Sequence, residues 1–231
     1  MSTTSSAGPA PAPSPRRAGN GSGRAPRKLM DAAASLFCAK GYEATTTQDL
    51  AAALGIQKPT LYHHMASKEK LLFEIMQDAH NQVREAVGRA VAGAPTPGAK
   101  VEALIHAHMT TMLGNREYHY VMLVEHRSLS DEHQAQLRRL HKEYGAHIKS
   151  VLADAQTAGV LRTDIVTSHL AFLLTNLMNW SIFWYRQSGG LSPHQITSLI
   201  QTQFLHGAMM HSARPERSPS SVGRPRTRAS G

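Results

Sequence analysis

Helical periodicity is the feature that most limits how this chain can fold. Apolar side chains recur at helical spacing across residues 29–212, and the alternating pattern of β-branched residues that marks strands is absent. An amphipathic helix has to cover its apolar stripe with another element. With helices alone available, that element is another helix, so we expect an all-α fold.

Glycine, proline and capping residues divide this pattern into nine expected helices. Thr46 and Asp49 have the spacing of a capping box, and Ser67 can cap the long helix that follows. Gly41 and Gly55 are expected helix stops. The expected helices span about residues 26–40, 46–54, 58–65, 68–91, 100–113, 116–127, 131–158, 164–187 and 193–211.

Charge is concentrated at the two ends of the chain, whose formal net charge is +9. Residues 1–28 hold five basic and no acidic residues, and residues 213–231 hold five arginines and one glutamate. Both ends are rich in Pro, Ser and Gly, so we expect a disordered basic arm over 1–25 and a disordered basic tail over 213–231. Such segments either bind polyanions such as nucleic acid or keep a protein soluble.

Several classes of protein are disfavoured. The sequence has no apolar run long enough to span a membrane and no signal-peptide core at its start. Cys38 is the single cysteine, which excludes an internal disulfide and suits core packing. Neither a G-x-S-x-G motif nor a phosphate-binding glycine loop occurs. We therefore expect a cytoplasmic protein that is not an enzyme and needs no cofactor.

The 14 histidines do not form a recognisable metal motif. His63 and His64 are adjacent, and neighbours on a helix point about 100° apart, so they are poor joint ligands for one ion. None of the remaining histidines are paired at a spacing of about four residues, the spacing that places two side chains on one helix face. We predict no metal site and expect these side chains to be hydrogen-bonded or exposed.

Two short expected helices, separated by GIQ and preceded by a longer helix, form a helix-turn-helix pattern. Residues 36–72, LFCAKGYEATTTQDLAAALGIQKPTLYHHMASKEKLL, resemble the DNA-binding domain of TetR-family transcriptional regulators, and the match extends over about 29–75. The resemblance implies a DNA-binding domain at 26–75 and a helical ligand-binding and dimerisation domain at 76–212.

Donor-bearing side chains on the second short helix suit the backbone and base edges of DNA. The helix that starts at Lys68 offers a phosphate its terminal amides and a lysine, and Thr45 and Thr46 can act similarly one helix earlier. The resemblance implies that Tyr62 and Lys68 contact phosphates. It also implies that the major groove is faced by Gln57, Lys58, Thr60 and His63.

Two features of this motif are unusual. Gln57 stands where the family usually has Ser or Thr, and because glutamine can bond adenine, the change could alter sequence preference. Between Leu29 and Ile75 there are four lysines and five acidic residues, a weak charge for a DNA-binding surface. We therefore expect the 1–28 arm to supply part of the attraction to phosphates.

Residues 164–187 are apolar nearly all round, which predicts a helix buried on two sides. In the family this arrangement places one side on a ligand cavity and the other on a second copy of the chain. The last helix is expected to complete a four-helix homodimer interface through Ile196, Ile200, Phe204, Met209 and Met210. A core helix of a monomer is the alternative.

Trp180 and Trp184 share a helix face and are followed by Arg186. The segment NWSIFWYRQSGGLSPHQ resembles the corresponding part of KstR-type TetR regulators, which respond to acyl-CoA thioesters. The resemblance implies an apolar platform of two indoles and a guanidinium for a CoA phosphate. Packing of both tryptophans in the dimer interface is the alternative.

Together these features predict a homodimeric, ligand-responsive transcriptional repressor. It is expected to bind a pseudo-palindromic double-stranded DNA operator and to be released by a small hydrophobic or acyl-CoA effector. Two alternatives stay open: a TetR-like regulator of a drug or other metabolite response without a CoA ligand, and a helical scaffold that has lost DNA binding.

Overall fold

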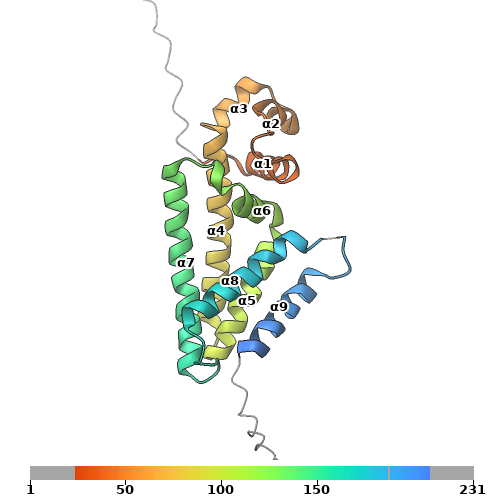
Figure 1. Cartoon of the computed structure of the whole chain (residues 1–231). Helices are drawn as coiled ribbons and strands as arrows, with labels where there is room; N and C mark the ends of the chain where they lie inside the picture. The colour runs from red at the N-terminus through yellow and green to blue at the C-terminus, as the bar shows by residue number, and fades with distance from the viewer. Residues whose placement is uncertain (1–23, 187, 209–231) are drawn as a thin grey trace, which may run out of the picture.

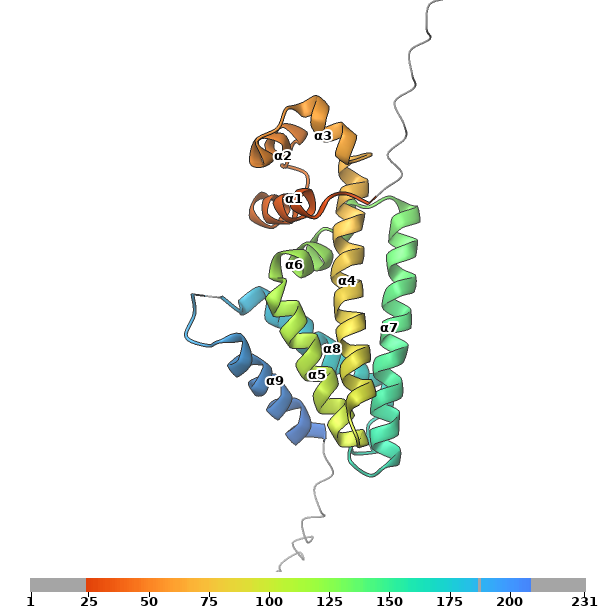
Figure 2. The ribbon, with the colours of Figure 1, turned by 180° about the vertical axis from the view of Figure 1, so that it is seen from behind.

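The structure is a computed structural model that describes residues 24–186 and 188–208. Within these residues it contains nine α-helices, a short 3-10 turn and no strand, so the predicted all-α class is confirmed. Helices α1–α3 gather at one end of the long helix α4, and α5–α9 pack along the rest (Figures 1 and 2). The elements are α1 (Arg27–Lys40), α2 (Thr47–Leu54), α3 (Lys58–His64), α4 (Lys68–Gly93), α5 (Pro97–Gly114), α6 (Arg116–Val124), η1 (His126–Ser128), α7 (Asp131–Thr157), α8 (Thr167–Trp184) and α9 (Pro193–Ala208).

Local signals in the sequence set the ends of the first four helices. Asp49 N–H donates to the Thr46 hydroxyl at 3.1 Å, and Thr46 N–H donates to the Asp49 carboxylate at 2.7 Å, which confirms the expected capping box. Gly55 ends α2 with a φ of 65°, a left-handed conformation that glycine adopts readily. Ser67 caps α4, and the fully buried side chain of Leu61 anchors α3 to the N-terminal core.

Helix α4 belongs to both halves of the core. Its residues 71–79 pack in the N-terminal cluster, whereas Val83 and the residues beyond it pack in the C-terminal cluster. Tyr118 and Val121 of α6 also belong to the N-terminal cluster. The predicted boundary at residue 75 therefore falls inside a continuous helix that both halves share.

Two expected helices are shorter in the structure. The helix predicted for 164–187 is confined to α8, and that predicted for 116–127 ends at Val124, where η1 takes over. The amide of Gln156 donates to the carbonyls of Arg162 at 2.8 Å and Ile165 at 2.9 Å, which holds the chain in a turn before α8. None of the described helices is long and apolar enough to cross a membrane.

Three of the residues through which the last helix was expected to join the interface point into the chain's own core, while an interface role for the helix itself stays a prediction. Ile196, Ile200 and Phe204 are buried within the chain's own C-terminal core, where α9 packs against α5, so they are not free to form an interface. The predicted continuation of α9 to residue 211, with Met209 and Met210, lies outside the described residues.

The predicted arm and tail also lie largely outside the described residues. The arm was expected to be disordered up to residue 25, but Arg24 and Ala25 are ordered. The backbone N–H of Ala25 donates to the Glu74 carboxylate at 2.8 Å, and the Ala25 side chain is buried.

Of the histidines in the described part of the chain, three are buried: His80 on α4, His108 on α5 and His119 on α6, with 4%, 4% and 2% of their surface exposed. Burial, with a smaller contribution from neighbouring histidines, lowers the pKa of His80 and of His108 to about 4. Burial also lowers the pKa of His119. All three imidazoles are therefore neutral at physiological pH.

We expect the free energy of unfolding to fall as the pH drops from 7.5 to 5. Unfolded histidines bind a proton near pH 6.5, whereas folded His80 and His108 resist protonation until about pH 4, so acid favours the unfolded state. Linkage predicts a loss of about 2 kcal/mol for each of these two groups, measurable by urea unfolding at the two pH values. Between pH 7.5 and pH 5 the free energy of unfolding of His80→Phe should fall by less than that of the wild type. That of the control Ile148→Val should fall by as much as that of the wild type. An equal loss in His80→Phe and wild type would contradict the explanation.

Candidate DNA-binding surface and ligand cavity

Helix α3 presents donor-bearing side chains to solvent at one end of the molecule (Figure 1). Tyr62 is 52% exposed, while the adjacent Leu61 is fully buried, so the helix is fixed on one face and free on the other. Gln57 is the residue just before α3, and its side chain makes no capping bond to the helix. The candidate DNA-binding residues exposed here are Gln57, Lys58, Thr60, Tyr62 and His63.

The two threonines predicted to bind phosphate have structural roles. Thr45 is fully buried, and its hydroxyl donates to the Gly41 carbonyl at 2.8 Å, so its side chain cannot reach DNA. Thr46 is exposed, but its hydroxyl proton is donated to Asp49 at 2.7 Å within the capping box. The Thr45 side chain is therefore occupied within the fold, a phosphate would compete with Asp49 for the Thr46 hydroxyl, and the DNA-binding role of both residues stays a prediction.

Lys68 also has a structural role. Its ammonium group donates to the backbone carbonyls of Tyr42 and Thr45, each at 2.9 Å, and lies 4.1 Å from the centre of the Tyr42 ring. These bonds tie the start of α4 to the connection between α1 and α2. Only one of the three ammonium protons remains for a phosphate.

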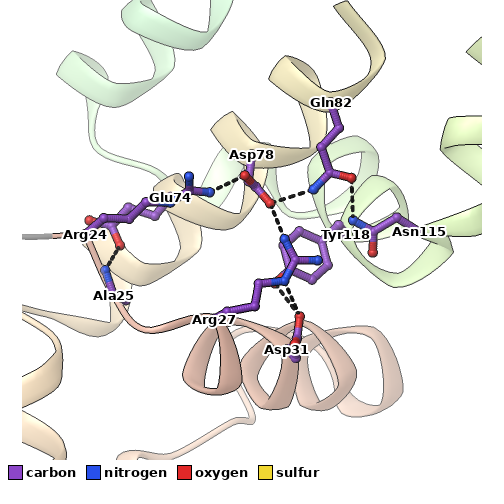
Figure 3. Close-up of polar contacts among 9 residues, drawn as sticks. All are labelled: Arg24, Ala25, Arg27, Asp31, Glu74, Asp78, Gln82, Asn115 and Tyr118. Atoms are coloured by element: carbon purple, nitrogen blue, oxygen red, sulfur yellow. Dashed lines mark hydrogen bonds and ion pairs between the residues drawn. The ribbon is translucent and has the colours of Figure 1, made fainter. Parts of the chain in front are cut away.

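Asp78 of α4 is the centre of an ion-pair cluster that joins the first helix to α4 (Figure 3). Its carboxylate accepts hydrogen bonds from Arg27 at 2.8 Å and from Arg24. One turn earlier, Glu74 holds the backbone N–H of Ala25. Asp78 and Glu74 are each 8% exposed, so these charges are satisfied by the residues that begin α1.

The same carboxylate is connected to the junction of α5 and α6 (Figure 3). The Gln82 amide donates to Asp78 at 2.6 Å, and its oxygen accepts from the Asn115 amide at 3.0 Å. On α6, the Tyr118 hydroxyl donates to Asp31 of α1 at 2.7 Å. Polar contacts from both α4 and α6 thus fix the position of α1.

A cavity of about 230 Å³ lies among helices α4 to α8. Four histidines line it, each from a different helix: His80, His108, His119 and His141. This convergence could not be predicted from spacing along the chain, because no two of these histidines share a helix. Among the described residues no group of three or more His, Cys, Asp and Glu side chains is placed to hold a metal ion.

Three polar side chains of the cavity wall bond one another. His108 Nε2 donates to the Asn179 side-chain oxygen at 3.2 Å, and the Tyr144 hydroxyl donates to His108 Nδ1 at 2.8 Å. His119 Nδ1 donates to the Asn115 carbonyl at 3.0 Å. Nε2 of His80, of His119 and of His147 is buried without a hydrogen-bond partner among the described residues, so the expectation that the histidines are all hydrogen-bonded or exposed does not hold at these three nitrogens.

A second cavity of about 500 Å³ adjoins the first and shares Met122, Leu123 and His141 with it. Its wall includes Arg127 and Arg138, both exposed. We call the first the inner cavity and the second the outer cavity. Neutral imidazoles and apolar side chains line the inner cavity, and two arginines line the outer one.

The three residues predicted to bind ligand line neither cavity. Trp180 is 66% and Trp184 is 46% exposed, and Arg186 lies in solvent beyond the end of α8. The ligand role of these residues stays a prediction. The tryptophans belong to an exposed apolar face of α8, made of Phe172, Leu173, Leu177, Trp180, Phe183 and Trp184.

Comparisons with known proteins agree with this architecture. Residues 29–75 match the family model described as bacterial regulatory proteins, tetR family, and residues 94–208 match the tetracyclin repressor-like C-terminal domain. The HTH-type transcriptional repressor KstR2 of Rhodococcus jostii (strain RHA1) is 30% identical over 197 residues, which cover 80% of this chain and 93% of that protein.

Solved structures give the same result. The TetR-family regulator PfmR of Thermus thermophilus is 30% identical with a TM-score of 0.73, over 78% of this chain and 97% of that one. AibR, solved in complex with isovaleryl coenzyme A and operator DNA, is 28% identical with a TM-score of 0.70, over 77% of this chain and 96% of that one. The chain therefore belongs to the TetR family of ligand-responsive, DNA-binding transcriptional regulators.

Proposed function

We propose that this chain is a repressor that works as a homodimer on a pseudo-palindromic operator, with one α3 helix in each of two major grooves. The observation that carries the proposal is the exposed, donor-rich face of α3 above the fully buried Leu61. Lys58 and Tyr62 are suited to phosphates, and Gln57, Thr60 and His63 to base edges. A protein bound to the chromosome works in the cytoplasm.

Lys58→Ala is expected to weaken binding to an operator selected from random-sequence DNA. Loss of one phosphate contact should lower the affinity several-fold and reduce the slope of log affinity against log salt by about 1. Fluorescence anisotropy over a salt series measures both quantities. Lys149→Ala, which removes an exposed lysine from α7, is the matched control. Equal effects of the two substitutions would contradict a specific role for Lys58.

The apolar face of α8 supports the dimer. Six large apolar side chains are exposed on this helix, and an apolar patch of this kind marks an interaction surface in soluble proteins. In a two-fold dimer the same face meets its own copy. We place Trp180 and Trp184 in this interface. A ligand could then contact them only if both protomers formed its binding site together.

Leu177→Arg should separate the protomers. Leu177 lies on the apolar face at 39% exposure, and the two-fold axis would bring two buried guanidinium groups into the interface. We expect the dimer dissociation constant to rise by about a hundredfold, as measured by analytical ultracentrifugation. Ser150→Arg, on the exposed side of α7, should leave association unchanged. Unchanged association of Leu177→Arg would show that α8 is not the interface.

The adjoining cavities support an effector with an apolar end and an anionic end. Most of the wall surface of the inner cavity is apolar although four histidines contribute to it, and the outer cavity carries Arg127 and Arg138. Guanidinium groups suit phosphates, and the structural neighbour AibR was solved with an acyl-CoA. We therefore propose an acyl-CoA-type effector, with the acyl group in the inner cavity and the phosphates at the outer one.

The ion-pair cluster around Asp78 couples the effector site to the DNA-binding helices in this proposal. Helix α4 lines the cavity through Ala79, His80 and Val83, and Asp78 on the same turn holds Arg24 and Arg27. An effector that shifts α4 would therefore move α1 and change the spacing of the two α3 helices. Only an effector that binds the two spacings with different affinities can act in this way.

Asp78→Asn is expected to lower operator affinity several-fold without unfolding the protein. The substitution removes the charge that holds two arginines, so α1 becomes looser on α4 and DNA binding has to restore its position. Anisotropy titration measures the affinity, and circular dichroism checks the helix content. Asp154→Asn, an identical change at an exposed position of α7, serves as the control. Wild-type affinity in Asp78→Asn would show that the cluster does not position the DNA-binding helices.

A further inference from the structure

Glu125, at the end of α6, is bonded to the segment that leads into the helix-turn-helix. Its carboxylate accepts a hydrogen bond from the backbone N–H of Tyr42 at 3.1 Å, although the two residues lie 83 positions apart in the chain. Tyr42 belongs to residues 41–46, the connection between α1 and α2. Among the described residues no other group accepts a hydrogen bond from this N–H. The bond therefore ties this connection to α6.

The backbone around Glu125 keeps its side chain directed at the connection. The Glu125 N–H donates to the Val121 carbonyl at 2.9 Å, and the Glu125 carbonyl accepts from the Ser128 N–H at 2.9 Å, across η1. Helix α6 itself lies against α1 in both views of the molecule (Figures 1 and 2). The carboxylate is therefore presented to Tyr42 from a helix end that is fixed on both sides.

Two side chains of opposite charge hold the connection from later helices. Lys68 of α4 donates to the carbonyls of Tyr42 and Thr45, each at 2.9 Å, while Glu125 accepts from the N–H of Tyr42. Such charge-assisted hydrogen bonds are stronger than those between neutral groups. The next residue, Thr46, caps α2, and α3 packs against α2. The position of the connection therefore sets where α2 starts and, through α2, where α3 lies.

We propose that Glu125 is a positioning residue for operator binding, which holds the connection, and with it α3, in the geometry that reads DNA. Glu125 acts through the Tyr42 N–H and has no contact with DNA in this proposal. Without the carboxylate the connection can shift in the unbound protein, so operator binding has to restore its position. The inference rests on the proposal that α3 reads the operator.

The direction of the effect separates positioning from simple electrostatics. Glu125 is acidic, and the loss of a negative charge by itself strengthens the attraction to DNA phosphates. Glu125→Gln and Glu125→Met both lose the charge and keep a side chain of similar length, but only glutamine retains an oxygen that accepts a hydrogen bond well. Positioning therefore predicts weaker operator binding for Glu125→Met and not for Glu125→Gln.

Fluorescence anisotropy tests both variants on an operator selected with the wild-type protein and on an unrelated duplex of the same length. We expect Glu125→Met to bind the operator about fivefold more weakly than the wild type, the effect of losing one net hydrogen bond, and Glu125→Gln to stay within about twofold. Affinity for the unrelated duplex should not fall in either variant, because nonspecific binding depends on charge. Glu143→Met, an equivalent loss of charge at an exposed position of α7, should retain wild-type selectivity.

Amide hydrogen exchange of the free protein, followed by NMR, tests the contact itself. The Tyr42 N–H should exchange faster in Glu125→Met than in the wild type, because its acceptor is lost, and close to the wild-type rate in Glu125→Gln. Glu125→Ala, which removes the side chain altogether, should repeat the changes of Glu125→Met. Circular dichroism melts establish that each variant is folded.

The positioning role and the repressor function can fail separately. The positioning role is wrong if Glu125→Met keeps wild-type operator affinity, if it loses the same factor on both duplexes, if Glu125→Gln loses as much, or if exchange of the Tyr42 N–H is unchanged. The proposed repressor function stands in each of these cases. If the wild-type protein selects no operator, the repressor function is wrong and the positioning role fails with it.

Discussion

The shared burial of α4 is the constraint on which the rest of the structure depends. Leu71 to Ala79 pack with α1–α3, and Val83 to Val91 pack with α5–α9, along one uninterrupted helix. A packed helix moves as a rigid rod because the side chains of its neighbours interdigitate with its buried face. The DNA-binding helices and the cavity therefore cannot change position independently.

Polar contacts reinforce this coupling where α1, α4 and the junction of α5 and α6 meet. Asp78 faces Arg24 and Arg27, and Gln82, one turn further along α4, bonds Asn115 between α5 and α6. These groups are partnered, so they fix geometry. His80 and His119 lie close by in the cavity wall, and Nε2 of each has no hydrogen-bond partner among the described residues.

Much of the DNA-binding half could be predicted, because its determinants are local. The capping box at Thr46, the left-handed Gly55 and the cap at Ser67 each act over a few residues, and the exposed face of α3 follows from the burial of Leu61. Lys68 and Thr45 were the exceptions. Their partners are backbone carbonyls of the connection between α1 and α2, and a sequence pattern does not show where a long side chain turns.

The sequence by itself determined the all-α class, the helix-turn-helix and the family, since all three depend on periodicity and on motifs within short stretches. Only the tertiary structure decided where α9 packs, that Trp180 and Trp184 lie outside the cavities, and that histidines from four helices meet around one cavity. These features depend on how helices far apart in the chain rotate and cross. That geometry results from the packing of all the side chains together, so no single segment contains it.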